Sequence, residues 1–193
     1  MSKTITLNLN KDLIMEAVKA ETYDTGRINK AADPVKNAPI GFSEQAGGEE
    51  HQERQLLRFL KQAVGKFEAQ MGEFLEASKG AVADTLSSNT STFTITLIVN
   101  DRFNNGMRNP MASLCEDFLI NQMLFTWWNG RDQAFSKTFV LMAQDDIEQI
   151  RLCMIKTAPA ASSADYTSVT GTVTDNDPDD DDNQNDNDNE QDD

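Results

Sequence analysis

The strongest constraint on the fold is a change of hydrophobic period within residues 92–155. Apolar and polar side chains alternate through the first part of this segment, which predicts a strand with one apolar face formed by Phe93, Ile95, Leu97 and Val99. From Asn109 onward apolar residues recur at three- and four-residue spacing, which is typical of an amphipathic helix. The same spacing resumes after Trp127, Trp128, Asn129 and Gly130. The segment therefore predicts a strand followed by an antiparallel helical hairpin.

Local signals place the ends of these helices. Asn109 followed by Pro110 predicts an N-cap with proline at the first helical position. Gly130 closes this helix and Asp132 is positioned to cap the next one. Pro159 is expected to stop the last helix.

The N-terminal half predicts a second strand and two further helices. Residues 4–9 alternate, with Ile5, Leu7 and Leu9 on one face, and Asn10 is the expected N-cap of a helix of about three turns that ends before Tyr23. The two strands either pair with each other or form separate hairpins; the pattern favours neither. Residues 49–79 form the longest predicted helix, in which Gly65 and Gly72 leave room for the close approach of another helix.

Composition divides the chain into a folded domain and a tail. Residues 175–193 contain eleven Asp and Glu and no Lys or Arg, so the rest of the chain carries −4 of the net charge of −15. We expect a mainly α (α+β) domain at residues 1–158, a helical bundle with a small β-strand element. It includes a long irregular arm at residues 25–48, rich in Gly and Pro. Residues 159–193 are the expected linker and disordered acidic tail.

The sequence predicts no catalytic, cofactor or metal site. The single histidine, His51, and the acidic first turn of Glu49, Glu50 and Glu53 are expected on a solvated surface. Asp145, Asp146 and Glu148 are likewise expected on the solvated face of the last helix. Cys115 and Cys153 fall on apolar helical faces and are expected to be reduced core residues. No phosphate-binding loop or zinc spacing is present in the sequence, and we expect no enzymatic activity.

Trp127 and Trp128 admit two interpretations. Consecutive helical residues point about 100° apart, so both cannot lie at the centre of one apolar stripe, and one is expected to be peripheral. The peripheral ring is either half-buried against the core or an exposed anchor at an oligomer interface. With Phe93, Ile95, Leu97 and Val99 of the strand, these two residues are the candidate interaction residues.

Four segments carry a resemblance to a known group of proteins. They are residues 20–26 (Ala-Glu-Thr-Tyr-Asp-Thr-Gly), the Arg58-Phe59-Leu60 helix, the strand at residues 92–100 with Asp101-Arg102-Phe103, and the helix end at Trp127-Trp128. Together they resemble small virion-region proteins of tailed bacteriophages and prophages, especially those of Bacteroides-type hosts. The resemblance covers most of residues 3–157; the acidic residues 175–193 depart from it.

The resemblance implies a non-enzymatic structural subunit of the virion. Such proteins form homo-oligomeric rings as head-tail connector or neck subunits, next to the portal and to neighbouring neck or tail subunits. DNA contact is expected only by passage through the ring, and membrane contact is not expected. Synthesis in the bacterial host cytoplasm and a place in the virion follow. The alternative is an acidic interaction protein, either a DNA mimic or a virion assembly factor, that acts through its Asp-rich tail.

Overall fold

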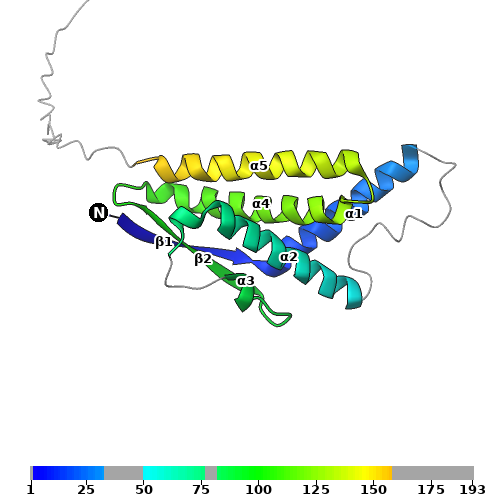
Figure 1. Ribbon diagram of the computed structural model, residues 1–193, viewed down its shortest axis with the longest axis horizontal. Helices are drawn as coiled ribbons and strands as arrows, with labels where there is room; N and C mark the ends of the chain where they lie inside the picture. The colour runs from blue at the N-terminus through cyan, green and yellow to red at the C-terminus, as the bar shows by residue number, and fades with distance from the viewer. Residues whose placement is uncertain (1, 33–49, 77–81, 158–193) are drawn as a thin grey trace, which may run out of the picture. The chain divides into compact units, whose positions relative to one another are not determined.

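The computed structural model describes residues 2–32, 50–76 and 82–157, which belong to one compact unit, Met1–Ala160 (Figure 1). The order of elements is β1 (Ser2–Asn10), α1 (Lys11–Ala32), α2 (Glu50–Gln70), the 3-10 turn η3 (Gly72–Phe74), α3 (Val82–Thr85), β2 (Thr92–Asn100), the 3-10 turn η5 (Asn105–Met107), α4 (Arg108–Trp128) and α5 (Gln133–Ile155). The predicted fold class, a mainly helical domain with a small β element, is confirmed. The acidic tail lies outside the described residues.

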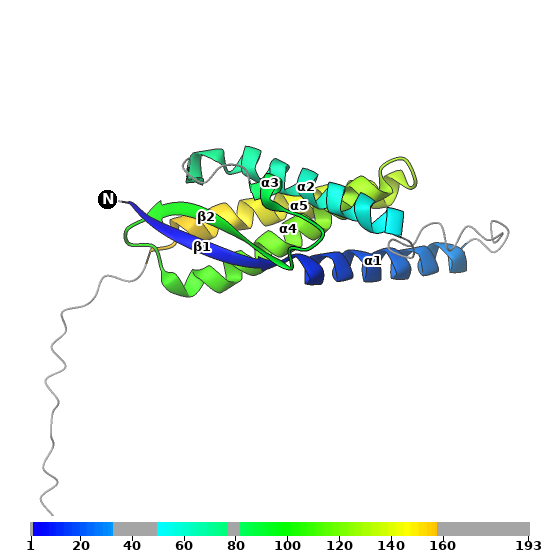
Figure 2. The ribbon, with the colours of Figure 1, turned by 90° about the horizontal axis from the view of Figure 1, so that it is seen from below.

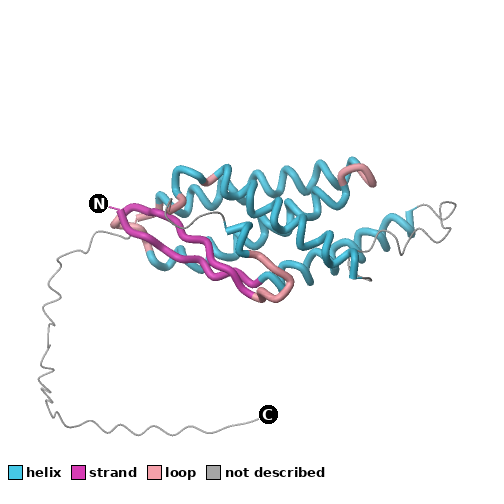
Figure 3. The backbone as a smooth tube through the Cα atoms, turned by 60° about the horizontal axis from the view of Figure 1, so that its bottom comes forward, coloured by secondary structure: helices cyan, strands magenta, loops and turns pink. Residues whose placement is uncertain are grey.

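The two strands pair with each other in an antiparallel sheet (Figure 3). Ile5 lies opposite Leu97 and Leu7 lies opposite Ile95, so the apolar residues of both strands share one face. That face is buried in the core, whereas Thr4 and Thr94 on the other face are exposed. The sequence left open whether the two strands pair with each other or form separate hairpins, and the structure shows that they pair with each other.

Helix α4 lies at the centre of the domain. It packs against α5 on one side and also contacts α2, α1 and β1 (Figures 1 and 2). Its second half is therefore buried on nearly all sides, including four consecutive residues at positions 121–124. Aromatic pairs join α4 to its neighbours: Phe118 meets Phe67 of α2 with ring centroids 5.5 Å apart. The helix is therefore buried around its circumference rather than along one stripe, and its buried polar residues Asn121 and Gln122 are hydrogen-bonded to Asp146 and Lys66.

Helix α1 is longer than the sequence predicts. Asn10 caps it as expected, because its Oδ1 accepts hydrogen bonds from the backbone N–H groups of Asp12 (3.0 Å) and Leu13 (3.2 Å). The predicted end before Tyr23 is wrong, since the helix continues to Ala32. A single glycine such as Gly26 costs a helix only about 1 kcal/mol, and residues 27–32 include several good helix formers. The helix thus includes residues 25–32 of the predicted arm; residues 33–48 lie outside the described residues.

Two other predicted boundaries are corrected. Helix α4 begins at Arg108, so Asn109 is a helical residue and not the N-cap. Pro110 is then the third helical residue, where its missing N–H still has no intrahelical acceptor. Helix α2 ends at Gln70 instead of residue 79. A Cβ built on Gly65 or Gly72 would meet no atom of another segment within 4 Å, so the close approach of another helix that these glycines left possible does not occur.

The turn between α4 and α5 agrees with the prediction. Asp132 accepts hydrogen bonds from the backbone N–H groups of Ala134 (2.8 Å) and Phe135 (3.2 Å), which confirms it as the N-cap of α5. Gly130 has a φ of +93°, a conformation that suits glycine best. Helix α5 ends at Ile155, and Pro159 lies outside the described residues.

Candidate functional site: a groove between α1 and α2

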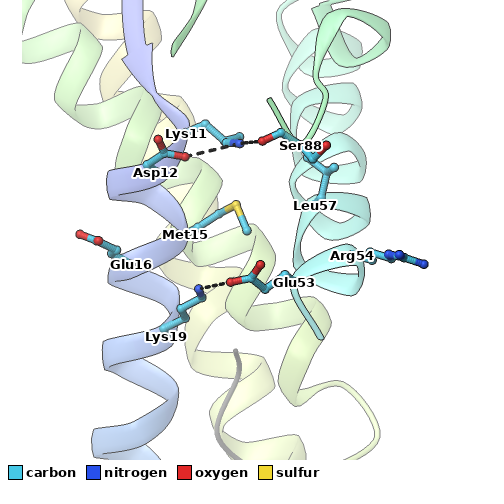
Figure 4. A pocket seen from close by; sticks show the side chains of 9 residues that line it. All are labelled: Lys11, Asp12, Met15, Glu16, Lys19, Glu53, Arg54, Leu57 and Ser88. Carbon is cyan, nitrogen blue, oxygen red and sulfur yellow. Dashed lines mark hydrogen bonds and ion pairs between the residues drawn. The ribbon is translucent and has the colours of Figure 1, made fainter. Parts of the chain in front are cut away.

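A groove of about 530 Å³ opens between the first half of α1 and the start of α2 (Figure 4). It is lined by Lys11, Asp12, Met15, Glu16, Lys19, Glu53, Arg54, Leu57 and Ser88. The volume is within the range of small-ligand or peptide side-chain sites. Its surroundings combine an apolar floor with charged ends.

Met15 and Leu57 form the apolar floor of the groove, and both pack partly buried against the core. Their position follows from helix geometry, because each is the neighbour in sequence of a buried core residue, Ile14 in α1 and Leu56 in α2. A step of one residue turns the side chain by about 100°, from the core to the edge of the helix pair. The sequence analysis missed both residues as site candidates. The sequence signal that could have identified them is a large apolar residue that directly follows a residue of the apolar helix face, as Met15 follows Ile14 and Leu57 follows Leu56.

Lys11 closes one end of the groove, and its side chain is engaged. Only 5% of the residue is exposed. Its Nζ donates to the carbonyl oxygens of Ser88 (2.9 Å) and Ser87 (3.4 Å) and lies 3.4 Å from Asp12 Oδ1. Its backbone N–H also donates to Ser91 O at 2.9 Å. Lys11 therefore connects the start of α1 to the loop before β2, and three protein oxygens lie within 3.4 Å of its Nζ.

An ion pair crosses the other end of the groove. Lys19 Nζ of α1 lies 3.1 Å from Glu53 Oε1 of α2. Both side chains are accessible to solvent, so the pair contributes little stability and opens at small cost. Glu16 and Arg54 point away from the groove in Figure 4. Glu53 is exposed as predicted, whereas Glu49 and the side chains of Glu50 and His51 lie outside the described part of the chain.

This arrangement is suited to docking a segment of polypeptide. Met15 and Leu57 offer contact to one apolar side chain, while the Lys19–Glu53 pair at the rim supplies hydrogen-bonding groups for a backbone. Within residues 2–32, 50–76 and 82–157, no group of three or more His, Cys, Asp and Glu residues is placed to hold a metal ion.

The six candidate interaction residues lie in the core. Phe93, Ile95, Leu97 and Val99 form the inner face of the sheet and are at most 5% exposed. Trp127 and Trp128 are each 1% exposed, so the expectation of one peripheral tryptophan, and with it an exposed aromatic anchor, is wrong for this domain. The reason is that α4 has neighbours on more than one side. Trp127 packs on Phe59 of α2, with ring centroids 6.5 Å apart, and Trp128 on Phe135, at 5.5 Å.

Both edges of the sheet are partly covered by the protein itself. On the β1 edge, Arg108 Nε donates to Thr6 O (2.9 Å) and Asn10 N–H donates to Glu116 Oε1 (3.2 Å). On the β2 edge, Glu76 N–H lies 3.4 Å from Thr96 O, beside a bridge between Leu75 and Leu97. Such coverage reduces the backbone available to an added strand. The α1–α2 groove is therefore the more open docking surface.

One acidic residue of α5 departs from its predicted environment. Asp146 is half-buried and accepts a hydrogen bond from Asn121 Nδ2 of α4 at 2.8 Å. Burial raises the pKa of Asp146 above its ordinary value; the Asn121 hydrogen bond opposes this shift, and nearby Asp117 and Asp145 add to it. Asp145 and Glu148 are exposed, as predicted.

The two cysteines match the prediction. Cys115 and Cys153 are both free and buried in the core. Burial strongly raises the pKa of the Cys115 thiol, with smaller contributions from Glu116, Asp146 and Cys153. A buried thiol that stays protonated is a poor nucleophile and a poor metal ligand. Cys115 therefore serves packing in this domain, and Cys153 is likewise a buried core residue.

None of the helices in the described part of the chain is long and apolar enough to span a membrane. Comparisons with family models, with curated proteins and with solved structures found no match to the chain.

Proposed function

We propose that this protein is a non-enzymatic structural subunit of a tailed-phage virion, a head-tail connector or neck subunit that assembles into a homo-oligomeric ring. The resemblance of residues 3–157 to phage virion-region proteins suggests the context. The observation that carries the proposal is the open groove between α1 and α2, with its apolar floor of Met15 and Leu57. A ring needs such a receiving surface on every subunit, together with a segment that reaches it from the neighbour.

The part of the arm that connects α1 to α2, residues 33–48, is the proposed reaching segment. Its sequence places Ile40 and Phe42 on either side of Gly41 and shortly after Pro39. Both are large apolar residues, and they stand next to Pro39 and Gly41, which are unfavourable in a helix interior. One of them fits the apolar floor of a neighbour's groove, and the Lys19–Glu53 pair then faces the arm backbone. The contact is head-to-tail, the type that closes a ring when the rotation between subunits permits.

The ring contact is tested with three variants of the full chain in native mass spectrometry and light scattering. We expect Ile40→Ser with Phe42→Ser, and separately Leu57→Glu, to shift the protein from oligomer toward monomer. Leu13→Ser, which alters an exposed leucine of α1 that does not line the groove, is the matched control and should leave the mass unchanged. Equal masses for all variants would remove the groove and arm from the interface.

The virion assignment needs its own measurement. Mass spectrometry of purified phage particles should detect the protein at ring stoichiometry, and its gene is expected between the portal and tail-tube genes. Hydrogen exchange should show greater protection of the arm and of the Met15 segment in particles than in the free protein. Absence from particles, or equal protection in both samples, would contradict the connector proposal. An acidic interaction protein that acts through residues 175–193 would then be the better interpretation.

A further inference from the structure

We propose that the outer face of α5 docks an amphipathic helix of a different protein, one that carries basic residues at the middle of its apolar face. The surface, named here the α5 stripe, consists of Leu141, Asp145, Glu148, Leu152 and Ile155. This docking surface is independent of the proposed ring contact, because it involves neither the arm nor the α1–α2 groove.

The α5 stripe is a straight line of side chains. Its members are spaced by four, three, four and three residues. In an α-helix these positions fall within an arc of roughly 80° and extend over about 21 Å. A partner helix of about four to five turns covers such a length, which is the usual geometry of helix-on-helix recognition.

The α5 stripe faces away from the rest of the domain. The opposite side of α5 is buried on α4 through Phe139, Ala143, Ile147 and Ile150. Figure 1 shows α5 as the outer helix, with α4 on its inner side. Leu141 is 64% exposed, Leu152 is 47% exposed and Ile155 is 71% exposed. A single exposed leucine is ordinary on a protein surface, but three large aliphatic residues on one line mark a candidate interface.

The charges in the α5 stripe select the partner. Asp145 and Glu148 are exposed between the aliphatic ends. If two copies of α5 packed against each other, leucine on leucine, Asp145 and Glu148 of both copies would meet at the centre in either direction. Four carboxylates would then be desolvated together, which opposes self-association. A helix with Lys or Arg opposite this centre and Leu-like residues at its ends satisfies both parts of the pattern.

Two synthetic peptides serve as probes for this surface. Each forms a helix of about five turns with leucine at both ends of one face. The first carries two lysines at the central positions of that face, and the second carries two glutamates. Binding of each labelled peptide to the full-length protein is followed by fluorescence anisotropy. The variants are Leu141→Ser with Leu152→Ser, Asp145→Lys with Glu148→Lys, and Leu13→Ser as the control for an exposed leucine elsewhere.

We expect the lysine peptide to bind and the glutamate peptide to bind at least about tenfold more weakly. The double leucine variant should lose about tenfold in affinity or more, whereas Leu13→Ser should bind like the wild type. The charge-reversed variant should prefer the glutamate peptide. The proposal is overturned if neither peptide binds, or if the double variant Leu141→Ser with Leu152→Ser binds as tightly as Leu13→Ser. It is also overturned if the charge-reversed variant still prefers the lysine peptide. The last result would place the attraction elsewhere, as in the acidic residues 175–193.

Discussion

Phe67 of α2 and Phe118 of α4 are both fully buried, and their rings meet edge to face with centroids 5.5 Å apart and an interplanar angle of 66°. The pair joins the central helix to the helix that forms one wall of the groove. Replacing either ring by alanine removes a buried aromatic side chain and leaves a cavity that a packed core closes only in part. We therefore expect Phe67→Ala and Phe118→Ala each to lower the free energy of unfolding by about 3–5 kcal/mol.

The two losses should not add. The edge-to-face contact contributes about 0.5–1.5 kcal/mol beyond the buried area, and either substitution alone already removes it. The double variant should thus lose less than the sum of the single variants by about this amount. The combined loss from two alanine substitutions approaches the total free energy of unfolding of an ordinary domain. The double-mutant cycle is therefore better measured with Phe67→Leu and Phe118→Leu.

Urea denaturation followed by circular dichroism measures these differences, and Leu13→Ala provides the control. Leu13 is 58% exposed, so its truncation should change stability by less than about 0.5 kcal/mol. In thermal unfolding, a loss of 3–5 kcal/mol corresponds to a decrease in Tm of about 6–20 °C for a domain of this size. Unchanged midpoints for both alanine variants would show that α2 does not pack on α4 as described. Strict additivity in the double-mutant cycle with Phe67→Leu and Phe118→Leu would exclude the ring contact but not the packing of α2 on α4.

Three other predictions concern charge. Asp146→Asn should stabilise the protein at neutral pH, because the raised pKa means that ionised Asp146 is disfavoured in the folded state. Wild-type stability attributable to this group should fall as pH rises from the ordinary carboxyl pKa through the raised one. Urea denaturation across that pH range, with exposed Glu148→Gln as the control, checks the sign, and equal behaviour of the two variants would contradict it. Lys11→Met keeps the aliphatic stem but removes the bonds to the Ser87 and Ser88 carbonyls, so unfolding experiments should show a loss of about 1.5–3 kcal/mol. Lys19→Met, which removes an accessible ion pair, should lose less than about 1 kcal/mol, and equal losses would refute the role of Lys11. Deleting residues 175–193 should leave the helical circular dichroism signal and cooperative unfolding intact. It should also increase self-association in light scattering, because the net charge changes from −15 to −4. A non-cooperative transition in the truncated chain would mean that these residues take part in folding.

Much of the local structure was predictable because its causes are local. The period-two pattern of Ile5, Leu7 and Leu9 and the helical spacing after Asn109 each identify an element from its own residues. The caps at Asn10 and Asp132 were predictable for the same reason, since a side-chain oxygen bonds to backbone N–H groups two or three residues away. Errors of boundary arose where two local signals competed. At Gly26, the helix formers that follow outweigh the glycine.

The sequence by itself therefore determined the type of most elements and their buried faces, whereas the tertiary structure decided what each face meets. The pairing of β1 with β2 joins residues about ninety positions apart in the chain, beyond the reach of any periodicity. Both Trp127 and Trp128 are buried because α2 and α5 lie on different sides of α4, and a helical pattern does not reveal how many neighbours a helix has. For the same reason Asp146 meets Asn121 across a helix interface instead of solvent. The groove beside Met15 and Leu57 exists because α1 and α2, separated by the arm in sequence, are brought together only by the fold.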